Sequence, residues 1–100
     1  MTTVITKDNF ESFINDNENV LIDFHACWCG PCRAMSPIID EFAKKHPEIA
    51  IGKCDVEDNE EIASMFGVLN LPFIAFLKNA ELVNSAVGLQ TIEKLESLVS

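Results

Sequence analysis

The sequence predicts an α/β fold in which a central mixed β-sheet carries helices on both faces. Short apolar runs alternate along the 100 residues with segments of helical periodicity, in the order β-α-β-α-β-α-β-β-α. Helical connections make the early strands parallel where they are neighbours, whereas the last two strands follow each other as an antiparallel hairpin. A mixed sheet between two layers of helices is the simplest architecture for this order.

Composition limits the number of domains and the class of partner. A chain of 100 residues with 48% apolar residues suffices for one core, so we expect a single domain spanning residues 1–100. The net charge of −9 argues against nucleic acid or an anionic membrane as a partner, and solubility is its simplest interpretation. Residues 1–10 contain no signal peptide and no stretch approaches a membrane span, so we expect a cytoplasmic protein with reduced thiols.

The first elements are a short strand, a short helix and a central strand. Residues 3–5 are a strand candidate, and Thr6 or Asp8 can cap the helix that follows. Residues 20–24 are almost continuously apolar, as expected of a strand covered on both faces, and Asp23 interrupts them. The apolar positions of the short helix have helical spacing: Phe10, Phe13 and Ile14.

The longest helix is expected directly after the cysteines at positions 29 and 32. A basic cluster at residues 44–46 suits the negative end of its dipole, and Pro47 ends it. Pro37 lies inside this helix and is expected to kink it near Arg33, whose carbonyl loses its partner. The apolar face repeats at helical spacing: Met35, Ile38, Ile39 and Phe42.

A third strand and a short helix follow. Residues 49–54 are apolar enough for a strand, and Asp58 or Asn59 is expected to cap the next helix, which Gly67 closes. That helix carries three apolar residues: Ile62, Met65 and Phe66.

The chain is expected to end with a hairpin and a helix. Residues 73–77 and 82–87 are apolar runs whose spacing predicts a hairpin, although Ala80 suits the positive φ of a two-residue turn poorly. Thr91 can cap the last helix. Its inward face consists of Ile92, Leu95 and Leu98 or Val99.

Cys29 and Cys32 stand where the central strand meets the long helix, with Pro31 in a first turn that tolerates proline. The positive end of the helix stabilises a thiolate on Cys29, while Cys32 lies one turn deeper, sheltered from an incoming protein but close enough to attack Cys29. This arrangement predicts a redox pair in which one thiol attacks a disulfide and the other resolves the mixed disulfide. Two buried structural cysteines or half a metal site are the alternatives.

The motif WCGPC at residues 28–32, with Phe24 before it and Arg33 after it, resembles the thioredoxin family, and so does the order of elements over nearly the whole chain. The resemblance implies a thioredoxin fold and a protein-disulfide reductase without cofactor or metal. It makes Cys29 the nucleophile, Cys32 the resolving thiol and Cys29–Cys32 the redox-active disulfide. The implied partners are a thioredoxin reductase and disulfide-containing protein substrates, and the protein is expected to be a monomer. The Gly-Pro dipeptide resembles reductant-type members.

Two charged residues are expected to support this pair. Burial in an apolar strand should raise the pKa of Asp23, which lies six residues before Cys29 and matches the family's buried aspartate. We predict that it is the general base for Cys32, with a solvated aspartate at the strand edge as the alternative. Lys53 matches the family's strand lysine, and either tunes Asp23 or is a solvated residue at a strand end.

The same resemblance predicts how substrates bind. Pro72 matches the family's cis-proline, beside which the backbone of the preceding residue pairs with an extended substrate. A proline that opens a strand is ordinarily trans, so the cis isomer is predicted by the resemblance alone. Burial in the core is the alternative for Leu71 and Leu89. The predicted apolar rim comprises Trp28, Gly30, Pro31, Leu71, Pro72, Gly88 and Leu89.

Three residues depart from the family pattern near the motif. His25 stands where many members have an aromatic residue, and shares a strand face with Asp23. It either titrates near the site or is a packing or surface histidine. Phe73 replaces the threonine that usually follows the cis-proline, and Asn70 replaces a small residue. Both are expected to change which substrates fit and to leave the thiol chemistry unaltered.

Two further cysteines are expected to be nonessential. Cys27 offers an alternative disulfide or a site of oxidation, and Cys54 packs as a small apolar residue. A zinc module with Cys27, the redox pair and either Cys54 or His25 is an alternative, but C-x-C-x-x-C matches zinc knuckles poorly. A thioredoxin-fold subunit that only binds a partner is another, although such a scaffold needs neither the redox pair nor Asp23.

Overall fold

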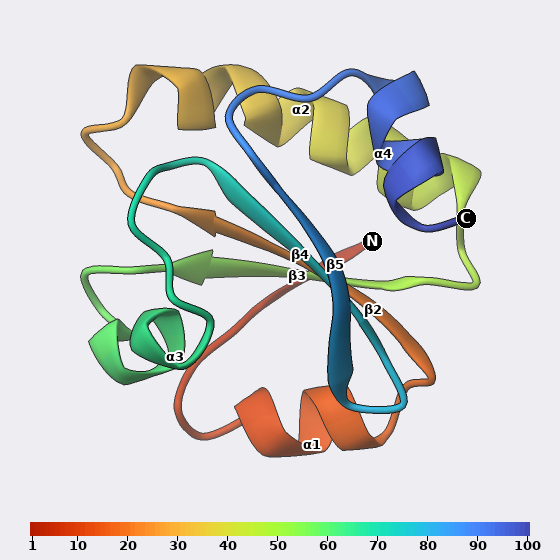
Figure 1. Cartoon of the computed structure of the whole chain (residues 1–100), viewed down its shortest axis with the longest axis horizontal. Coiled ribbons are helices and arrows are strands. Elements are labelled where there is room, and N and C mark those ends of the chain that lie inside the picture. The colour runs from red at the N-terminus through yellow and green to blue at the C-terminus, as the bar shows by residue number, and fades with distance from the viewer.

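The computed structural model describes residues 1–100. It contains one five-stranded sheet in the order β1-β3-β2-β4-β5. Helices α2 and α4 cover one face of the sheet, and α1 and α3 cover the other (Figure 1). The predicted order of elements and the mixed sheet between two helical layers are confirmed. The strands are β1 (Thr2–Val4), β2 (Asn19–His25), β3 (Ala50–Asp55), β4 (Phe73–Lys78) and β5 (Glu81–Val87). The helices are α1 (Phe10–Asn15), α2 (Gly30–Lys45), α3 (Glu60–Met65) and α4 (Ile92–Leu98).

The strand register brings the chemically important segments to one edge of the sheet. Strand β3 pairs in parallel with β1 and β2, whereas β4 is antiparallel to both β2 and β5. Phe24 near the end of β2 therefore lies opposite Phe73 at the start of β4, which in turn lies opposite Val87 at the end of β5. Helix α2 begins a few residues after β2, so its N-terminus is held at this same edge.

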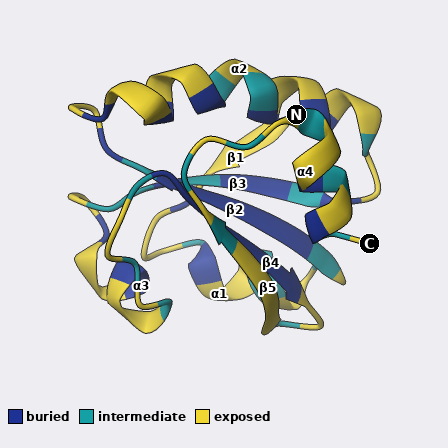
Figure 2. Ribbon diagram, turned by 45° about the horizontal axis from the view of Figure 1, so that its top comes forward, coloured by how far each residue is buried: buried dark blue, intermediate teal, exposed yellow.

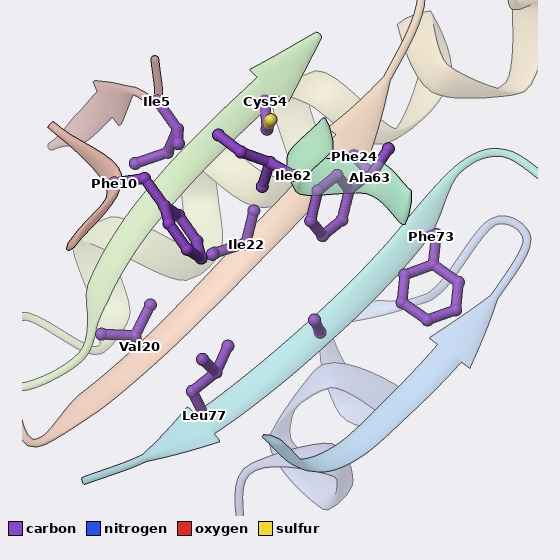
Figure 3. Close-up of a cluster of buried hydrophobic side chains, with 11 residues drawn as sticks. Ile5, Phe10, Val20, Ile22, Phe24, Cys54, Ile62, Ala63, Phe73 and Leu77 are labelled. Carbon is purple, nitrogen blue, oxygen red and sulfur yellow. The ribbon is translucent and has the colours of Figure 1, made fainter. Parts of the chain in front are cut away.

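Each face of the sheet has its own apolar core. Ile22 and Phe24 point toward α1 and α3, within the cluster drawn in Figure 3. Leu21 points toward α2 and α4, where Met35 and Ile39 pack against it. These two α2 residues are fully buried, as their helical spacing predicts. Because side chains alternate along a strand, Asp23 shares the α2 face with Leu21.

Helix α1 begins at a different cap from the predicted one. Its N-cap is Asn9, not Thr6 or Asp8. The Asn9 side chain closes the turn before the helix, because its Oδ1 accepts from the Thr6 N–H at 2.8 Å and its Nδ2 donates to the Val4 carbonyl at 2.8 Å. The cap therefore ties α1 to the end of β1 rather than to its own first turn.

The other turns and caps follow the sequence more closely. Asn59 is the N-cap of α3, but its side-chain amide donates to the Asp55 carbonyl at 3.0 Å rather than accepting from the helix. Thr91 caps α4 as predicted, since its hydroxyl accepts from the Lys94 N–H. The β4–β5 hairpin forms although Ala80 takes a positive φ of 66° beside Asn79 at 52°.

Helix α2 runs without interruption from Gly30 through Pro37 to Lys45, and His46 caps it just before Pro47, as predicted. None of the helices is long and apolar enough to cross a membrane.

Candidate active site

The two motif cysteines form the start of helix α2 and are disulfide-bonded to each other. Cys29 is the N-cap residue, and its Sγ accepts a hydrogen bond of 3.2 Å from the backbone N–H of Cys32. Cys29 and Cys32 are only 5% and 4% exposed. After reduction, the same N–H and the positive end of the helix would stabilise a thiolate on Cys29.

The turn between β2 and α2 is stabilised by two hydrogen bonds, one within the turn and one from α2. The Cys29 N–H donates to the Ala26 carbonyl at 3.2 Å. Arg33, in the first turns of α2, donates from Nη1 to the Cys27 carbonyl at 2.9 Å. These bonds connect the end of β2 to α2, so the position of Cys29 is set by both elements.

Asp23 is almost completely enclosed beneath α2. It is 1% exposed, and its Oδ1 has no hydrogen-bond partner. Burial raises the pKa of Asp23 to about 7; the nearby Lys53 ammonium opposes this rise, and the Asp40 carboxylate adds to it. Asp23 is therefore a buried acid that can hold or release a proton near neutrality, not a solvated strand-edge aspartate.

Lys53 lies beside Asp23 because the two residues are register partners in the parallel β2–β3 pair. Its Nζ is bound by Ser36 Oγ at 2.8 Å and Asp40 Oδ1 at 2.9 Å. Lys53 is thus fixed near the acid rather than free in solvent. Neither Ser36 nor Asp40 was predicted, although both follow Cys32 at intervals of four residues and so share its helix face.

A cleft beside α2 is lined by both Asp23 and Cys32. Its volume is about 290 Å³, enough for several water molecules at roughly 30 Å³ each. Asp23 and Cys32 both line it, so the carboxyl and the sulfur face the same space. We call it the site cleft; it is lined by Asp23, His25, Ala26, Cys27, Cys32, Arg33, Ser36 and Lys53.

Leu71, just before Pro72 and β4, packs against the cysteine pair. The Leu71–Pro72 peptide bond is cis, which confirms the prediction from the resemblance. The Pro72 carbonyl accepts from the Gly88 N–H at 2.8 Å, so the loops before β4 and after β5 are joined. Leu71 and Gly88 are half-buried and Pro72 is buried, whereas Leu89 is exposed and is not a core residue.

An apolar groove opens on the other side of Cys29. Its volume is about 390 Å³. Trp28 is 64% exposed at its rim, and Gly30 and Pro31 are exposed beside it. The sequence did not predict the contributions of Val68 and Leu69. The groove is lined by Trp28, Cys29, Val56, Val68, Leu69, Asn70 and Leu71.

The remaining candidates separate into core and surface. Phe73 is buried against Phe24, with ring centroids 6.0 Å apart, so its side chain faces the core. Its effect on which substrates fit stays a prediction. Asn70 is exposed in the groove. Cys54 packs in the core as predicted, and burial raises the pKa of its thiol to about 11. Cys27 is exposed, with its Sγ 3.9 Å from the Glu57 carboxylate.

His25 lies near the site, as one of its two interpretations predicted. It is half-buried and lines the site cleft beside Asp23. Burial lowers the pKa of its imidazole, with the carboxylate of Asp55 opposing this effect. No three or more His, Cys, Asp or Glu side chains are grouped so that they could hold a metal ion.

Comparison with known proteins agrees with this geometry. The family model described as Thioredoxin matches residues 1–100. The chain belongs to the thioredoxin family. It is 38% identical over 97 residues to a thioredoxin of Alicyclobacillus acidocaldarius, covering 96% of this chain and 92% of that protein. It is 37% identical over 100 residues to a thioredoxin of Chlamydia pneumoniae, covering 100% of this chain and 97% of that protein.

Solved thioredoxin structures share the fold. A mutant thioredoxin from Halobacterium salinarum NRC-1 superimposes with a TM-score of 0.92 at 32% identity, covering 98% of this chain and 87% of that chain. Thioredoxin from Plasmodium falciparum does so with a TM-score of 0.90 at 30% identity, covering 97% and 95%. The protein is therefore a thioredoxin-family dithiol–disulfide oxidoreductase with protein-disulfide reductase activity, and Cys29–Cys32 is its redox-active pair.

Proposed function

We propose that Cys29 is the nucleophile and Cys32 the resolving thiol of this protein-disulfide reductase, and that a thioredoxin reductase returns the pair to the dithiol. The hydrogen bond from the Cys32 N–H to Cys29 Sγ is the observation that carries these roles. It places a donor and the positive helix end on one sulfur only, which favours the thiolate at Cys29.

The reaction then proceeds in two exchanges. The Cys29 thiolate attacks one sulfur of the substrate disulfide, forming a mixed disulfide and releasing the first substrate thiolate. Cys32 next loses its proton, attacks Cys29 Sγ and releases the second substrate thiolate, which leaves the Cys29–Cys32 disulfide. Two electrons pass from the dithiol to the substrate, and both leaving thiolates take up protons from solvent.

Asp23 is the general base that accepts the proton of Cys32, and Lys53 tunes it. The raised pKa of Asp23 and the shared site cleft support this role, because a base is most effective when its pKa lies near the working pH. Lys53 opposes the rise in the pKa of Asp23 and is itself oriented by Ser36 and Asp40.

Protein substrates bind across the apolar surface around Cys29. The cis-Pro72 segment supplies a backbone edge for an extended peptide, and the groove beside Trp28 accepts apolar side chains. The rim residues in this role are Trp28, Gly30, Pro31, Leu71, Pro72 and Gly88.

Residues 1–100 act as one domain and as a monomer in the cytoplasm. The net charge of −9 supports the monomer through self-repulsion, and it disfavours nucleic acid and anionic membranes as partners. The two unpaired cysteines, Cys27 and Cys54, suit a compartment that keeps thiols reduced.

Reduction of insulin disulfides tests these roles, first with dithiothreitol and then with a thioredoxin reductase as the electron source. Cys29→Ser should abolish turnover, whereas Cys32→Ser should form mixed disulfides that persist on non-reducing gels. Cys27→Ser is the matched control and should keep full activity. The assignment is wrong if Cys29→Ser traps substrate, or if Cys27→Ser loses turnover as completely as Cys29→Ser does.

A further inference from the structure

A second cleft shares lining residues with the site cleft. The second cleft has a volume of about 570 Å³ and lies at the ends of β1 and β3. Its lining includes three acidic residues, Asp8, Asp55 and Asp58. His25 and Lys53 are the two residues that line both clefts. Any side chain that carries a proton from one cleft to the other must therefore be one of these two.

His25 is able to carry a proton, and Lys53 is not. The Lys53 ammonium is a cation held by Asp40 and Ser36, so it has no lone pair to accept a proton. The half-buried imidazole of His25 has a lowered pKa and is neutral at pH 7, with one nitrogen that accepts and one that donates. The charged and titratable groups that line these clefts around it are Lys7, Asp8, Asp23, Cys27, Cys32, Arg33, Lys53, Asp55 and Asp58, with Asp40 beyond Lys53.

If Asp23 accepts the proton of Cys32, it must afterwards release that proton. A carboxyl whose pKa is about 7 releases its proton to water at only about 10³ s⁻¹, even at a recapture rate constant of about 10¹⁰ M⁻¹ s⁻¹. Asp23 is 1% exposed, and its Oδ1 has no partner within the protein. A neighbouring base that takes the proton would therefore speed its release.

We propose that His25 is the proton relay between Asp23 and solvent. The imidazole accepts the proton of the Asp23 carboxyl across the site cleft, directly or through water, and its other nitrogen releases a proton to water in the second cleft. The ring ends neutral as the other tautomer, one proton has left Asp23, and no electron moves. His25 acts through Asp23 rather than on the sulfur atoms, so this inference rests on the proposed role of Asp23 as the base.

The exchange of the Asp23 proton can be measured directly in the oxidised protein. With carbon-13 in the aspartate carboxyl groups, the Asp23 signal should move with pH as one sharp averaged line while the relay operates. His25→Phe, which keeps an aromatic ring but cannot carry a proton, should slow the exchange at least about tenfold and broaden the line near the midpoint. His25→Ala should broaden it likewise, and added imidazole should sharpen it again, because this variant leaves room for the ring. His46→Ala is the matched control and should leave the line unchanged.

The possible outcomes distinguish a failure of the His25 relay from a failure of Asp23 as the base. Lines as sharp in both His25 variants as in the unaltered protein would overturn the relay and leave Asp23 as the base. Broadening that imidazole fails to relieve in His25→Ala would also overturn it, since a structural disturbance is not rescued by a free base. An Asp23 signal that does not titrate near neutrality in the unaltered protein would remove the base role, and the relay with it.

Discussion

Asp23 and Phe24 are neighbours on the central strand, equally inaccessible to solvent, and they point to opposite faces of the sheet. Phe24 lies in a continuous apolar core, with its ring 5.2 Å from that of Phe66 and 6.0 Å from that of Phe73. Asp23 shares its face with Leu21 but has a carboxyl oxygen without a partner. The inner strands β2, β3 and β4 are mostly buried, whereas the edge strands β1 and β5 are mostly exposed (Figure 2). Burial of Phe24 therefore stabilises the fold, whereas burial of Asp23 creates an acid that titrates near neutrality.

The difference between the two faces can be expressed as a free energy. Moving the pKa of Asp23 from 3.8 in the unfolded chain to about 7 corresponds to about 4 kcal/mol against the ionised form. Removing a buried phenylalanine side chain costs about 3–5 kcal/mol. The acid thus costs the fold about as much stability at alkaline pH as one large core side chain contributes.

The largest expected loss of stability is on the Phe24 face. Phe24→Ala should lower the free energy of unfolding by about 3–5 kcal/mol, because it leaves a cavity among Phe66, Phe73 and their neighbours. Denaturant unfolding followed by circular dichroism measures this. Reductase activity per folded molecule should stay close to that of the unaltered protein. A loss below about 1 kcal/mol would show that the Phe24 ring does not contribute to an apolar core on this face.

Asp23→Asn should raise the free energy of unfolding, whereas Phe24→Ala lowers it. The folded pKa of Asp23 is raised, so the folded state binds the proton more tightly, and stability falls as pH rises from about 4 to about 7. The asparagine variant lacks this loss and should be more stable than the unaltered protein by up to about 4 kcal/mol at pH 8. Near pH 4 the two should be similar.

The same variant should slow the resolution of mixed disulfides, measured by rapid mixing with a disulfide substrate at pH 7. Greater stability with an unchanged rate of resolution would keep the buried acid but remove its role as the base.

Lys53→Met should have a smaller effect, on the pH dependence of stability and of mixed-disulfide resolution. Lys53 opposes the rise in the pKa of Asp23, so its loss should move the pH window of stability and of resolution to higher values. Lys45→Met is the control, because Lys45 is exposed on α2 and paired with Glu41 at 3.5 Å. Equal pH profiles for the two lysine variants would show that Lys53 does not act on Asp23.

The smallest expected effect lies far from the site, where His46 joins the end of α2 to α4. Its ring nitrogens are 3.1 Å from Glu48 and 2.9 Å from Glu96, and the Glu96 hydrogen bond is the main cause of its raised pKa. This stabilisation is full below the ordinary histidine pKa and is lost as pH rises through the raised pKa. His46→Gln should therefore cost up to about 1 kcal/mol more at pH 6 than at pH 9, by thermal unfolding, because only the ionic part of the loss depends on pH. A cost that is equal at both pH values would contradict the ionic contribution.

Most of the fold could be predicted because local signals agreed with the final packing. The spacing of Met35, Ile39 and Phe42 identified the buried face of α2, and the apolar run of β2 identified the central strand. Contacts between distant segments could not be predicted in this way. Asn9 caps α1 through a bond to the end of β1, and Ala80 accepts a positive φ because the hairpin requires it.

In the site, too, local signals could be predicted from the sequence and contacts between distant segments could not. The redox pair follows from its own motif, and the anomaly of an acid within an apolar strand identified Asp23. Ser36 and Asp40 were missed, because their role depends on Lys53 from another strand. Val68 and Leu69 were missed because the groove closes only when the loop after α3 folds against Trp28.

The most direct test of the account is the pH titration of the Asp23 carboxyl carbon in the oxidised protein. The Asp23 carboxyl should titrate with a midpoint near pH 7, because it is buried on the α2 face and its Oδ1 has no hydrogen-bond partner. A midpoint near pH 4, the ordinary range of an aspartate, would contradict it and make the two faces of the central strand equivalent.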